Sequence, residues 1–479
     1  MNKNLIQKIK QSRHISLEFA LIIPFVLQII GAVGLVSYLS YRSGQKAVEE
    51  MANKLMDQAG NRIKDHLNHS LQIQQQTVAV NYHASQQKIL NIKDMEQVRS
   101  HLWQQINLLP NLTSTYFANE QGEQTAYFRL LSKEVVEKAS QLSGEHLSQG
   151  AVILGEAKLP DTMKRKYYLI DNQGRGRKFA YMLPVNVRLT DWYLAAKKAK
   201  KQTWSPVYLY KVPTTLGINA IAPIFDDRGQ LQGVFDSGII LAGISTFLND
   251  LNFSPSGLTF IMEHSGNLVA TSTLEAPYIQ DKTGKLNRLP ATQSKDTWTR
   301  TIARQLQQKY GDFRHIPEEV YLQVSVEKAI LFVKVSTYRD KYGLDWLLIT
   351  IVPDFDFMAE IYNNTKSMIL LSFITLVITL IIGVFTARWI NRPILSLNQA
   401  SQLIAKGEWH DFSMETNGVN QIANNGGITE LKILANSFQG MAIQLKKSFE
   451  TLEDRVQERT TELAIAKEKA EVANQAKST

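Results

Sequence analysis

The stretch Ser367–Ala387 constrains this chain more than any other part of the sequence, because it holds no charged residue. A helix that rises about 1.5 Å per residue needs about 20 apolar residues to cross a hydrocarbon core. Trp389 and Arg392 follow the stretch, as at the cytoplasmic end of a membrane span, and Pro393 is placed to begin a new helix. We therefore predict a transmembrane helix over residues 367–389, with sensing before it and response after it.

A second apolar stretch runs from Phe19 to Tyr41 and follows an N-terminus rich in Lys and Arg. A cleaved signal peptide would have a shorter apolar region, about 7–15 residues, and a small-x-small site that Ser37–Tyr41 does not offer. We expect an uncleaved helix over 19–41 after a cytoplasmic segment, 1–18, because basic flanks stay in the cytoplasm. Two spans then place residues 42–366 outside, in a multi-pass protein of the inner (plasma) membrane whose termini are both cytoplasmic.

The composition narrows the function classes. With 479 residues the chain is long enough for roughly three domains, and 20% charged residues fit neither a disordered chain nor a protein of many spans. The net charge of +9 comes without a zinc-finger, basic-zipper or RNA-recognition pattern, so we expect no nucleic-acid partner. The sequence has no cysteine, which excludes disulfides, thiolate metal sites and cysteine catalysis.

The outer segment, 42–366, alternates between helix and strand patterns. A long helix with few breakers is predicted over Gln45–Leu109. Its His66 and His69 have a spacing that suits solvated side chains equally well, so we predict no metal site. Runs of strands and turns then form a distal lobe at about 110–241 and a proximal lobe at about 255–352, each with an antiparallel sheet.

Three elements of this segment are predicted in detail. A hairpin is expected over residues 115–128, with its turn at Gly122. A helix is expected over Asp191–Lys201 and another over Asp354–Lys366, where it leads into the second span. The fold class is therefore an α+β membrane protein with two transmembrane helices.

A series of short motifs carries a family resemblance. It comprises Asp191-Trp-Tyr193, Thr203-Trp-Ser-Pro-Val-Tyr208, Ala222-Pro-Ile-Phe-Asp226, Pro255-Ser-Gly257 and Trp346 followed by Pro353. Together these motifs resemble the double Cache domain of bacterial receptors, over about residues 45–350. The resemblance implies two PAS-like lobes on a long helix, with the small-molecule ligand usually in the membrane-distal lobe. The pocket would lie between the distal sheet and the segment Asp191–Tyr208.

Amino-acid-binding members of this family place an Arg two residues before the Trp-Tyr pair and an Asp on the last distal strand. These positions are Thr190 and Gly238 here, with Arg188 and Asp236 two residues away. The motif therefore leaves the ligand unidentified. Each aromatic candidate either lines the pocket or fills the core. The candidate ligand-binding residues are Trp192, Tyr193, Trp204, Tyr208, Arg188, Asp236 and Tyr181.

The segment after the second span resembles a HAMP domain, over residues 390–446. A helix opened by Pro393, a polar connector over 407–428 and a second helix from Glu430 have the order of that domain. The resemblance implies a parallel four-helix bundle in a homodimer, with Pro393 and Glu430 as marker positions. A plain coiled-coil stalk is the alternative.

Apolar heptads continue through a predicted signalling coiled coil, 447–479. Two successive steps of four residues, which end at Leu445 and Phe449, form a stutter that locally unwinds such a coil. We expect the signal to pass through this junction. The predicted signalling residues are Pro393, Glu430, Leu434, Phe438, Met441, Leu445 and Phe449.

No phosphoacceptor His motif, nucleotide loop, GGDEF signature, zinc-protease motif or nucleophile elbow occurs in the sequence. We therefore predict no catalytic residue and no cofactor. The domain order resembles the input half of a hybrid histidine kinase. This implies a transmembrane sensor in a two-component phosphorelay, whose partners are an external small molecule, membrane lipid, a second copy, and a cytoplasmic kinase or response regulator. The alternatives are a receptor that acts on a separate partner and a truncated diguanylate cyclase input module.

Overall fold

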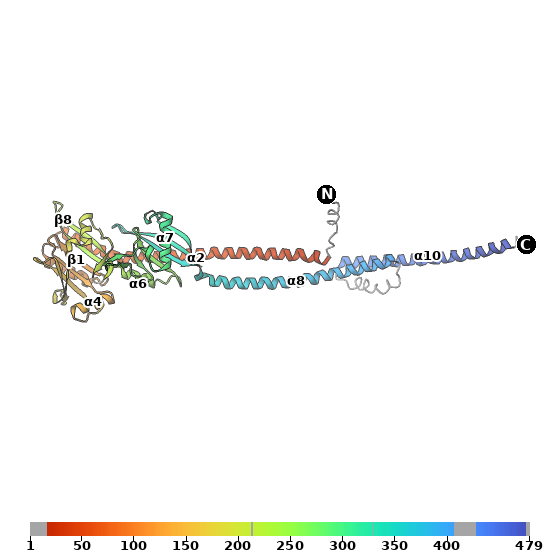
Figure 1. Ribbon diagram of the computed structural model, residues 1–479, viewed down its shortest axis with the longest axis horizontal. Coiled ribbons are helices and arrows are strands. Elements are labelled where there is room, and N and C mark those ends of the chain that lie inside the picture. Colours follow the sequence, from red (N-terminus) through yellow and green to blue (C-terminus); the bar gives the residue numbers. More distant parts are fainter. Residues whose placement is uncertain (1–16, 212–213, 328, 407–427, 476–479) are drawn as a thin grey trace. The chain divides into compact units, whose positions relative to one another are not determined.

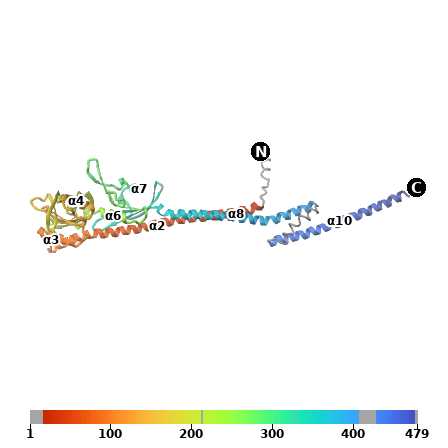
Figure 2. The same ribbon diagram turned by 90° about the horizontal axis from the view of Figure 1, so that it is seen from below.

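The computed structural model describes residues 17–211, 214–327, 329–406 and 428–475. The chain divides into two compact units, one over Ser43–Tyr362 and one formed by the residues up to Arg42 together with those from Asn363 onward. The first unit contains both lobes, which lie one after the other along α2 (Figures 1 and 2).

The long N-terminal helix ends earlier than the sequence pattern indicates. Helix α2 covers Leu17–Gln86, and a separate helix α3 covers Met95–Leu108, so the prediction of one helix to Leu109 is wrong. Two local features separate them. Lys88 has a left-handed φ of 58°, and the carboxylate of Asp94 accepts hydrogen bonds from the backbone N–H groups of Glu96 and Gln97. An Asp at this position favours the start of a new helix, because its carboxylate accepts hydrogen bonds from the free N–H groups in the first turn of that helix.

The distal lobe is built on one nine-stranded antiparallel sheet with the order β5-β4-β3-β2-β1-β9-β8-β6, in which β7 also pairs with β8. Its strands are β1 (Ser114–Asn119), β2 (Gln124–Arg129), β3 (Val152–Ala157), β4 (Lys164–Ile170), β5 (Gly176–Pro184), β6 (Thr203–Trp204), β7 (Tyr208–Lys211), β8 (Thr214–Phe225) and β9 (Leu231–Ile240). The predicted β1–β2 hairpin is confirmed. Helix α4 (Lys133–Ser143) and strand β3 were not predicted from the sequence.

The two faces of the distal sheet pack against different helices, because successive residues of a strand point to opposite faces. Phe117, Tyr127 and Phe235 belong to the core that includes α2 and α3. Their neighbours on the opposite face contact helix α5 (Asp191–Ala199) and the turn η1 (Val187–Leu189) before it. We call this second side the α5 face. The predicted helix at 191–201 is thus confirmed, and it covers the sheet as expected.

The proximal lobe has a five-stranded antiparallel sheet with the order β11-β10-β16-β15-β14. Its strands are β10 (Leu258–Glu263), β11 (Leu268–Thr271), β14 (Glu319–Val326), β15 (Ala329–Arg339) and β16 (Asp345–Pro353). Helix α6 (Ala242–Asp250) precedes this sheet, and α7 (Thr297–Tyr310) buries Ile302 and Leu306 against it. The lobe also contains the small hairpin β12 (Tyr278–Gln280) with β13 (Leu286–Arg288), and the turns η2 (Ala291–Gln293) and η3 (Phe313–His315). Two lobes with one main antiparallel sheet each agree with the predicted fold class.

Two helices, α2 and α8 (Phe355–Lys406), are long and apolar enough to cross a membrane. Helix α8 continues through Pro393, so the prediction that a new helix begins at this proline is wrong. Proline removes one backbone hydrogen bond from a helix, and the turns on both sides keep theirs. The helix is therefore weakened locally at Pro393 but does not end there.

The last helix, α10 (Thr429–Gln475), packs against the end of α8. Leu397 and Ala400 of α8 contact Ala435 and Ala442 of α10, with Phe438 beside them. The predicted connector over 407–428 lies almost wholly outside the described residues. Leu434, Met441, Leu445 and Phe449 are exposed in the single chain, as is Glu430 in the first turn of α10.

Candidate ligand-binding site in the distal lobe

Two ionisable side chains lie buried on the α5 face of the distal sheet. Arg165 of β4 is 8% exposed and Asp236 of β9 is 2% exposed. Asp236 pairs with Tyr116 in the ladder between β1 and β9, and the hydroxyl of Tyr116 lies next to the guanidinium of Arg165. One surface of the sheet therefore holds a cation and an acid together, which is uncommon without a bound partner or a function.

The guanidinium of Arg165 is held by neutral groups. Its Nε donates a hydrogen bond to Oε1 of Gln124 over 2.8 Å, and its Nη1 donates to the hydroxyl of Tyr167 over 3.3 Å. Its Nη2 donates to the hydroxyl of Tyr116, whose ring centre lies 4.8 Å from the guanidinium carbon. Among the residues that the structure describes, Arg165 forms no ion pair with a carboxylate.

Asp236 is also held by a neutral partner. Its Oδ2 accepts a hydrogen bond from Nδ2 of Asn219 over 2.6 Å. The amide oxygen of Asn219 accepts from the hydroxyls of Tyr208 and Tyr210, over 2.9 and 2.8 Å. Burial raises the pKa of Asp236 to about 8, although the bond from Asn219 and the charge of Arg165 act in the opposite direction. The carboxyl group is therefore mostly protonated at neutral pH.

Aromatic rings surround these polar groups. The ring of Trp192 meets that of Tyr116 edge to face at 5.0 Å, and Tyr181 stacks on Tyr167 at 4.5 Å. Gly155 leaves the necessary space, because a Cβ there would lie 3.0 Å from the ring of Phe128 and 3.1 Å from Cδ of Arg165. The arrangement suits a small polar molecule with an apolar part. We call the polar residues Tyr116, Gln124, Arg165, Tyr167, Tyr208, Tyr210, Asn219 and Asp236 the distal polar cluster.

Four residues predicted from the sequence lie in or beside the distal polar cluster, and three do not. Asp236 and Tyr208 belong to it, and Trp192 and Tyr181 pack against its rings.

Tyr193 is a buried residue of α5, and its hydroxyl donates to the carbonyl of Asn119 over 3.4 Å. Arg188 is exposed in η1. Trp204 belongs to the core on the other side of the sheet, and its indole N–H donates to Asp340 over 2.5 Å. It points there because it pairs with Ala220, which faces that same core.

Sequence reasoning missed the other members of the distal polar cluster, of which Arg165 is the main one. A signal was present in β4, where Arg165 alternates in phase with Tyr167 and Leu169, so the pattern places all three on the buried face. The space beside Gly238 is also filled by this cluster. A Cβ at this position would lie 2.6 Å from the hydroxyl of Tyr210 and 3.0 Å from Nδ2 of Asn219, so any side chain there would have to displace one of them.

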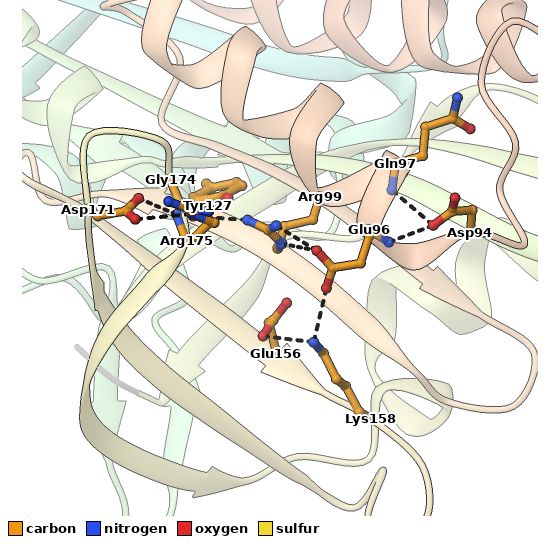
Figure 3. Close-up of polar contacts among 10 residues, drawn as sticks. All are labelled: Asp94, Glu96, Gln97, Arg99, Tyr127, Glu156, Lys158, Asp171, Gly174 and Arg175. Atoms are coloured by element: carbon orange, nitrogen blue, oxygen red, sulfur yellow. Dashed lines mark hydrogen bonds and ion pairs between the residues drawn. The ribbon is translucent and has the colours of Figure 1, made fainter.

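A second polar network ties the tip of the β4–β5 hairpin to helix α3 on the opposite side of the sheet (Figure 3). The hydroxyl of Tyr127 donates to the carbonyl of Gly174 over 2.5 Å. Arg99 of α3 forms an ion pair with Glu96 over 2.6 Å and donates to the same carbonyl over 3.5 Å. Lys158 joins Glu96 to Glu156, over 3.4 and 3.5 Å. The hairpin that carries Arg165 and Tyr181 is therefore attached to α3.

The proximal lobe has a hollow of about 450 Å³ between α2 and the strands β14 and β15, lined in part by Lys64, Glu318 and Arg339. Three of its four charged lining residues have partners among the described residues, and Glu319 is one of them through Lys334. Arg339 pairs with Glu318 over 2.5 Å, and Lys334 nearby pairs with Asp57 of α2 over 2.5 Å. These ion pairs leave less unpaired charge for a ligand to neutralise than the distal polar cluster does.

The class of the distal lobe follows from its sequence family. Residues 134–246 match the family model described as methyl-accepting chemotaxis protein-like, first PDC sensor domain. The matched range runs from α4 to α6 and includes Arg165, α5 and Asp236. This part of the chain is therefore similar to the PDC-like sensor domains of chemoreceptors and histidine kinases. No curated protein matches the chain in sequence.

Solved structures with a similar fold are ligand-binding parts of receptors and kinases. The ligand-binding domain of the Pseudomonas aeruginosa PAO1 amino-acid chemoreceptor PctB, in complex with L-Gln, is 15% identical, covers 65% of this chain and 93% of its own, and has a TM-score of 0.37. The extracellular domain of the putative histidine kinase mmHK1S-Z3 is 14% identical, with coverages of 68% and 98% and a TM-score of 0.38. The sensory domain of the Campylobacter jejuni chemoreceptor Tlp3 is 12% identical, with coverages of 66% and 97% and a TM-score of 0.40.

Proposed function

We propose that this chain is a transmembrane sensor that binds an extracytoplasmic small molecule at the distal polar cluster. The observation that carries the proposal is the buried Arg165, whose charge has no acidic partner among the described residues, in a domain of the PDC sensor type. A buried charge without a counter-charge is costly for a structural site and useful for a binding site. The amino-acid complexes among the similar structures agree with a small-molecule ligand.

The proposed signal path leaves the first unit through the proximal lobe. Strand β16 ends at Pro353 and α8 begins at Phe355, so the proximal sheet leads directly into the helix that holds the apolar stretch. A ligand that favours one arrangement of the lobes by about 1–3 kcal/mol would bias the position of α8. Residues 42–366 then act as the sensor and 367–389 as the moving span.

The proposed output is a two-component phosphorelay, reached through a HAMP domain at 390–446 and a coiled coil at 447–479 in a homodimer. The exposed apolar side chains of α10 support the packing of a second copy against this helix. They differ from the residues through which α10 contacts α8. These exposed residues are Leu434, Met441, Leu445 and Phe449. The two alternatives, a receptor that acts on a separate partner and a diguanylate cyclase input module, share the sensor and differ only in output.

Ligand screening tests the sensor proposal. Residues 42–366 are purified and heated with sets of metabolites, and a ligand at 100 times its dissociation constant is expected to stabilise the native state by about 2.7 kcal/mol. The same screen is run on Asp236→Asn, which alters the distal polar cluster, and on Arg339→Gln, which alters the proximal hollow. A ligand whose effect depends on Arg339 and ignores Asp236 would contradict the distal assignment.

A fused kinase tests the relay. The chain is joined to a histidine-kinase core, and autophosphorylation is measured with and without the ligand. Pro393→Ala and Glu430→Ala are expected to change the ratio of the two activities, whereas Lys447→Ala, on the exposed surface of α10, is not. An unchanged ratio in both marker variants would show that the signal does not use a HAMP-type step.

A further inference from the structure

We propose that the ligand of the distal lobe carries a carboxylate group, and that the guanidinium of Arg165 binds it. This inference rests on the proposed sensor function and adds the chemical class of the ligand and the residue that selects it. It also moves the anion-binding role from Arg188 in η1, two residues before the family position, to Arg165 in strand β4.

The first support is a comparison with the other well-covered cations of this unit. Arg99, Arg288 and Lys334 all pair with carboxylates, at 2.6, 3.3 and 2.5 Å. Arg129 instead donates to several backbone carbonyls, among them those of Leu112 and Gly150. Arg165 has neither kind of partner. Among these cations, Arg165 is thus the one whose buried positive charge has neither a carboxylate nor a backbone carbonyl as its partner within the described residues.

The second support is the number of hydrogen-bond donors left over. A guanidinium has five N–H groups, and the hydrogen bonds that Arg165 forms with the described residues use three of them. Gln124, which is 1% exposed, also keeps its side-chain Nε2 without a hydrogen-bond partner among the described residues. Buried donors of this kind normally have acceptors. A carboxylate offers two oxygens in one plane, which match a guanidinium and a neighbouring amide.

The charge balance favours a single carboxylate over a multiply charged anion at this position. One guanidinium compensates one negative charge, and the surrounding groups are the rings of Tyr116, Phe128 and Tyr167. Asp236 lies at the other end of the cluster, where its carboxyl donates to a hydroxyl or keto oxygen when it is protonated and accepts from an ammonium when it is ionised. Hydroxy acids, keto acids and amino acids therefore share the carboxylate and differ in their contact with Asp236.

Matched acids and amides test the inference on the full chain in lipid nanodiscs. Isothermal titration calorimetry compares propionate with propionamide, L-lactate with L-lactamide and L-alanine with L-alaninamide. We expect at least one acid to bind and its amide to bind 10- to 100-fold more weakly, about what loss of a charged hydrogen bond gives. Inorganic phosphate is the control for any anion. Repeating the titration in buffers of different ionisation enthalpy distinguishes the ligand classes by the number of protons released. An amino acid releases a proton from Asp236, and a hydroxy or keto acid does not.

Two arginine variants decide which residue binds the carboxylate. Arg165→Gln is expected to lose affinity for the acid by the same 10- to 100-fold, and Arg188→Gln to stay within threefold of the natural protein. Arg165→Lys keeps the charge and guards against a folding defect; it should lose affinity while its unfolding temperature in the absence of ligand stays near that of the natural protein. Retained affinity in Arg165→Gln, or loss in Arg188→Gln alone, would overturn the assignment.

The outcomes also separate this inference from the proposed function. Binding of neutral or cationic metabolites at the distal lobe, with no acid among them, would overturn the carboxylate and leave the sensor intact. An absence of binding by both the acids and the wider metabolite sets would contradict the sensor itself.

Discussion

Replacement of Asp236 by Asn should make the sensor unit more stable at neutral pH and leave it little changed in acid. The carboxyl of Asp236 has a pKa of about 8 in the folded chain because it is buried. In the unfolded chain the ordinary value is about 3.9. Between these values the native state holds a proton that the unfolded state has lost, so the free energy of unfolding falls as pH rises. The stabilising contribution is fully present below about pH 4 and is lost by about pH 8.

The slope for one such proton is at most about 1.4 kcal/mol per pH unit, so the loss from pH 5 to pH 7 is at most about 2.7 kcal/mol. The asparagine has no proton to lose, and its amide oxygen can still accept from Nδ2 of Asn219. We expect the difference between Asp236→Asn and the natural protein to move in favour of the variant by at least about 1 kcal/mol over this range. The other titratable groups that face Asp236, namely Arg165, Tyr116, Tyr208 and Tyr210, keep their protons there, since burial raises the pKa of the three tyrosines.

The assay is urea unfolding of residues 42–366 at pH 5, 6 and 7, followed by the fluorescence of Trp192 and Trp204 in the distal lobe. Asp171→Asn is the control. Its carboxylate is in the exposed β4–β5 turn, where the backbone N–H of Arg175 lowers its pKa, so it titrates below the range and its effect should be constant across it. A gap between Asp236→Asn and the natural protein that stays flat or shrinks from pH 5 to pH 7 would refute the reasoning.

Three further predictions concern the same unit. Arg129→Met should cost about 2–4 kcal/mol of unfolding free energy, because it leaves carbonyls such as those of Leu112 and Gly150 without their donor. Arg165→Met should cost no more than about 1 kcal/mol, because it also removes an uncompensated buried charge. Chemical denaturation of both variants checks this difference, and equal losses would contradict it. Gly155→Val should abolish ligand binding, since even a Cβ there would lie 3.1 Å from Cδ of Arg165. Gly144→Ala, at a site open to solvent, should change stability only. Calorimetry with the identified ligand distinguishes the two variants. Asp94→Ala should cost about 1 kcal/mol, measured by thermal unfolding, as the loss of a helix cap; no change would mean that α3 does not depend on this cap.

The sequence allowed the two-lobed fold to be predicted where hydrophobic periodicity and turn residues agree. The β1–β2 hairpin, helix α5 and the last three strands of the proximal lobe are of this kind. Strand β3 was missed because Gly155 and Glu156 interrupt its short apolar run. The break between α2 and α3 was missed because nothing before the cap Asp94 is a strong helix breaker. Pro393 was overinterpreted, since proline weakens a helix without always ending it.

The candidate site was harder to predict because its members come from strands that are distant in sequence. Asp236 was found through its distance from a family motif, and Trp192 through the motif itself. Arg165 and Gln124 belong to no motif, and only the register of β2, β3 and β4 brings them together. Trp204 was predicted beside the pocket and lies on the face of the sheet opposite the distal polar cluster, because a motif gives the order of residues and not the face on which they lie.

The strict alternation of the distal strands has a consequence for how such a receptor changes during evolution. Tyr116 and Asp236 lie on the α5 face, where we propose that the ligand binds, and their neighbours Phe117 and Phe235 pack against α2 and α3 on the other face. Substitutions at one set of positions can therefore alter what the domain recognises without disturbing the other set, which holds the helices in place. Chemical specificity and mechanical attachment are encoded in the same strands but can vary independently, so one scaffold can acquire new ligands and keep its mode of signalling.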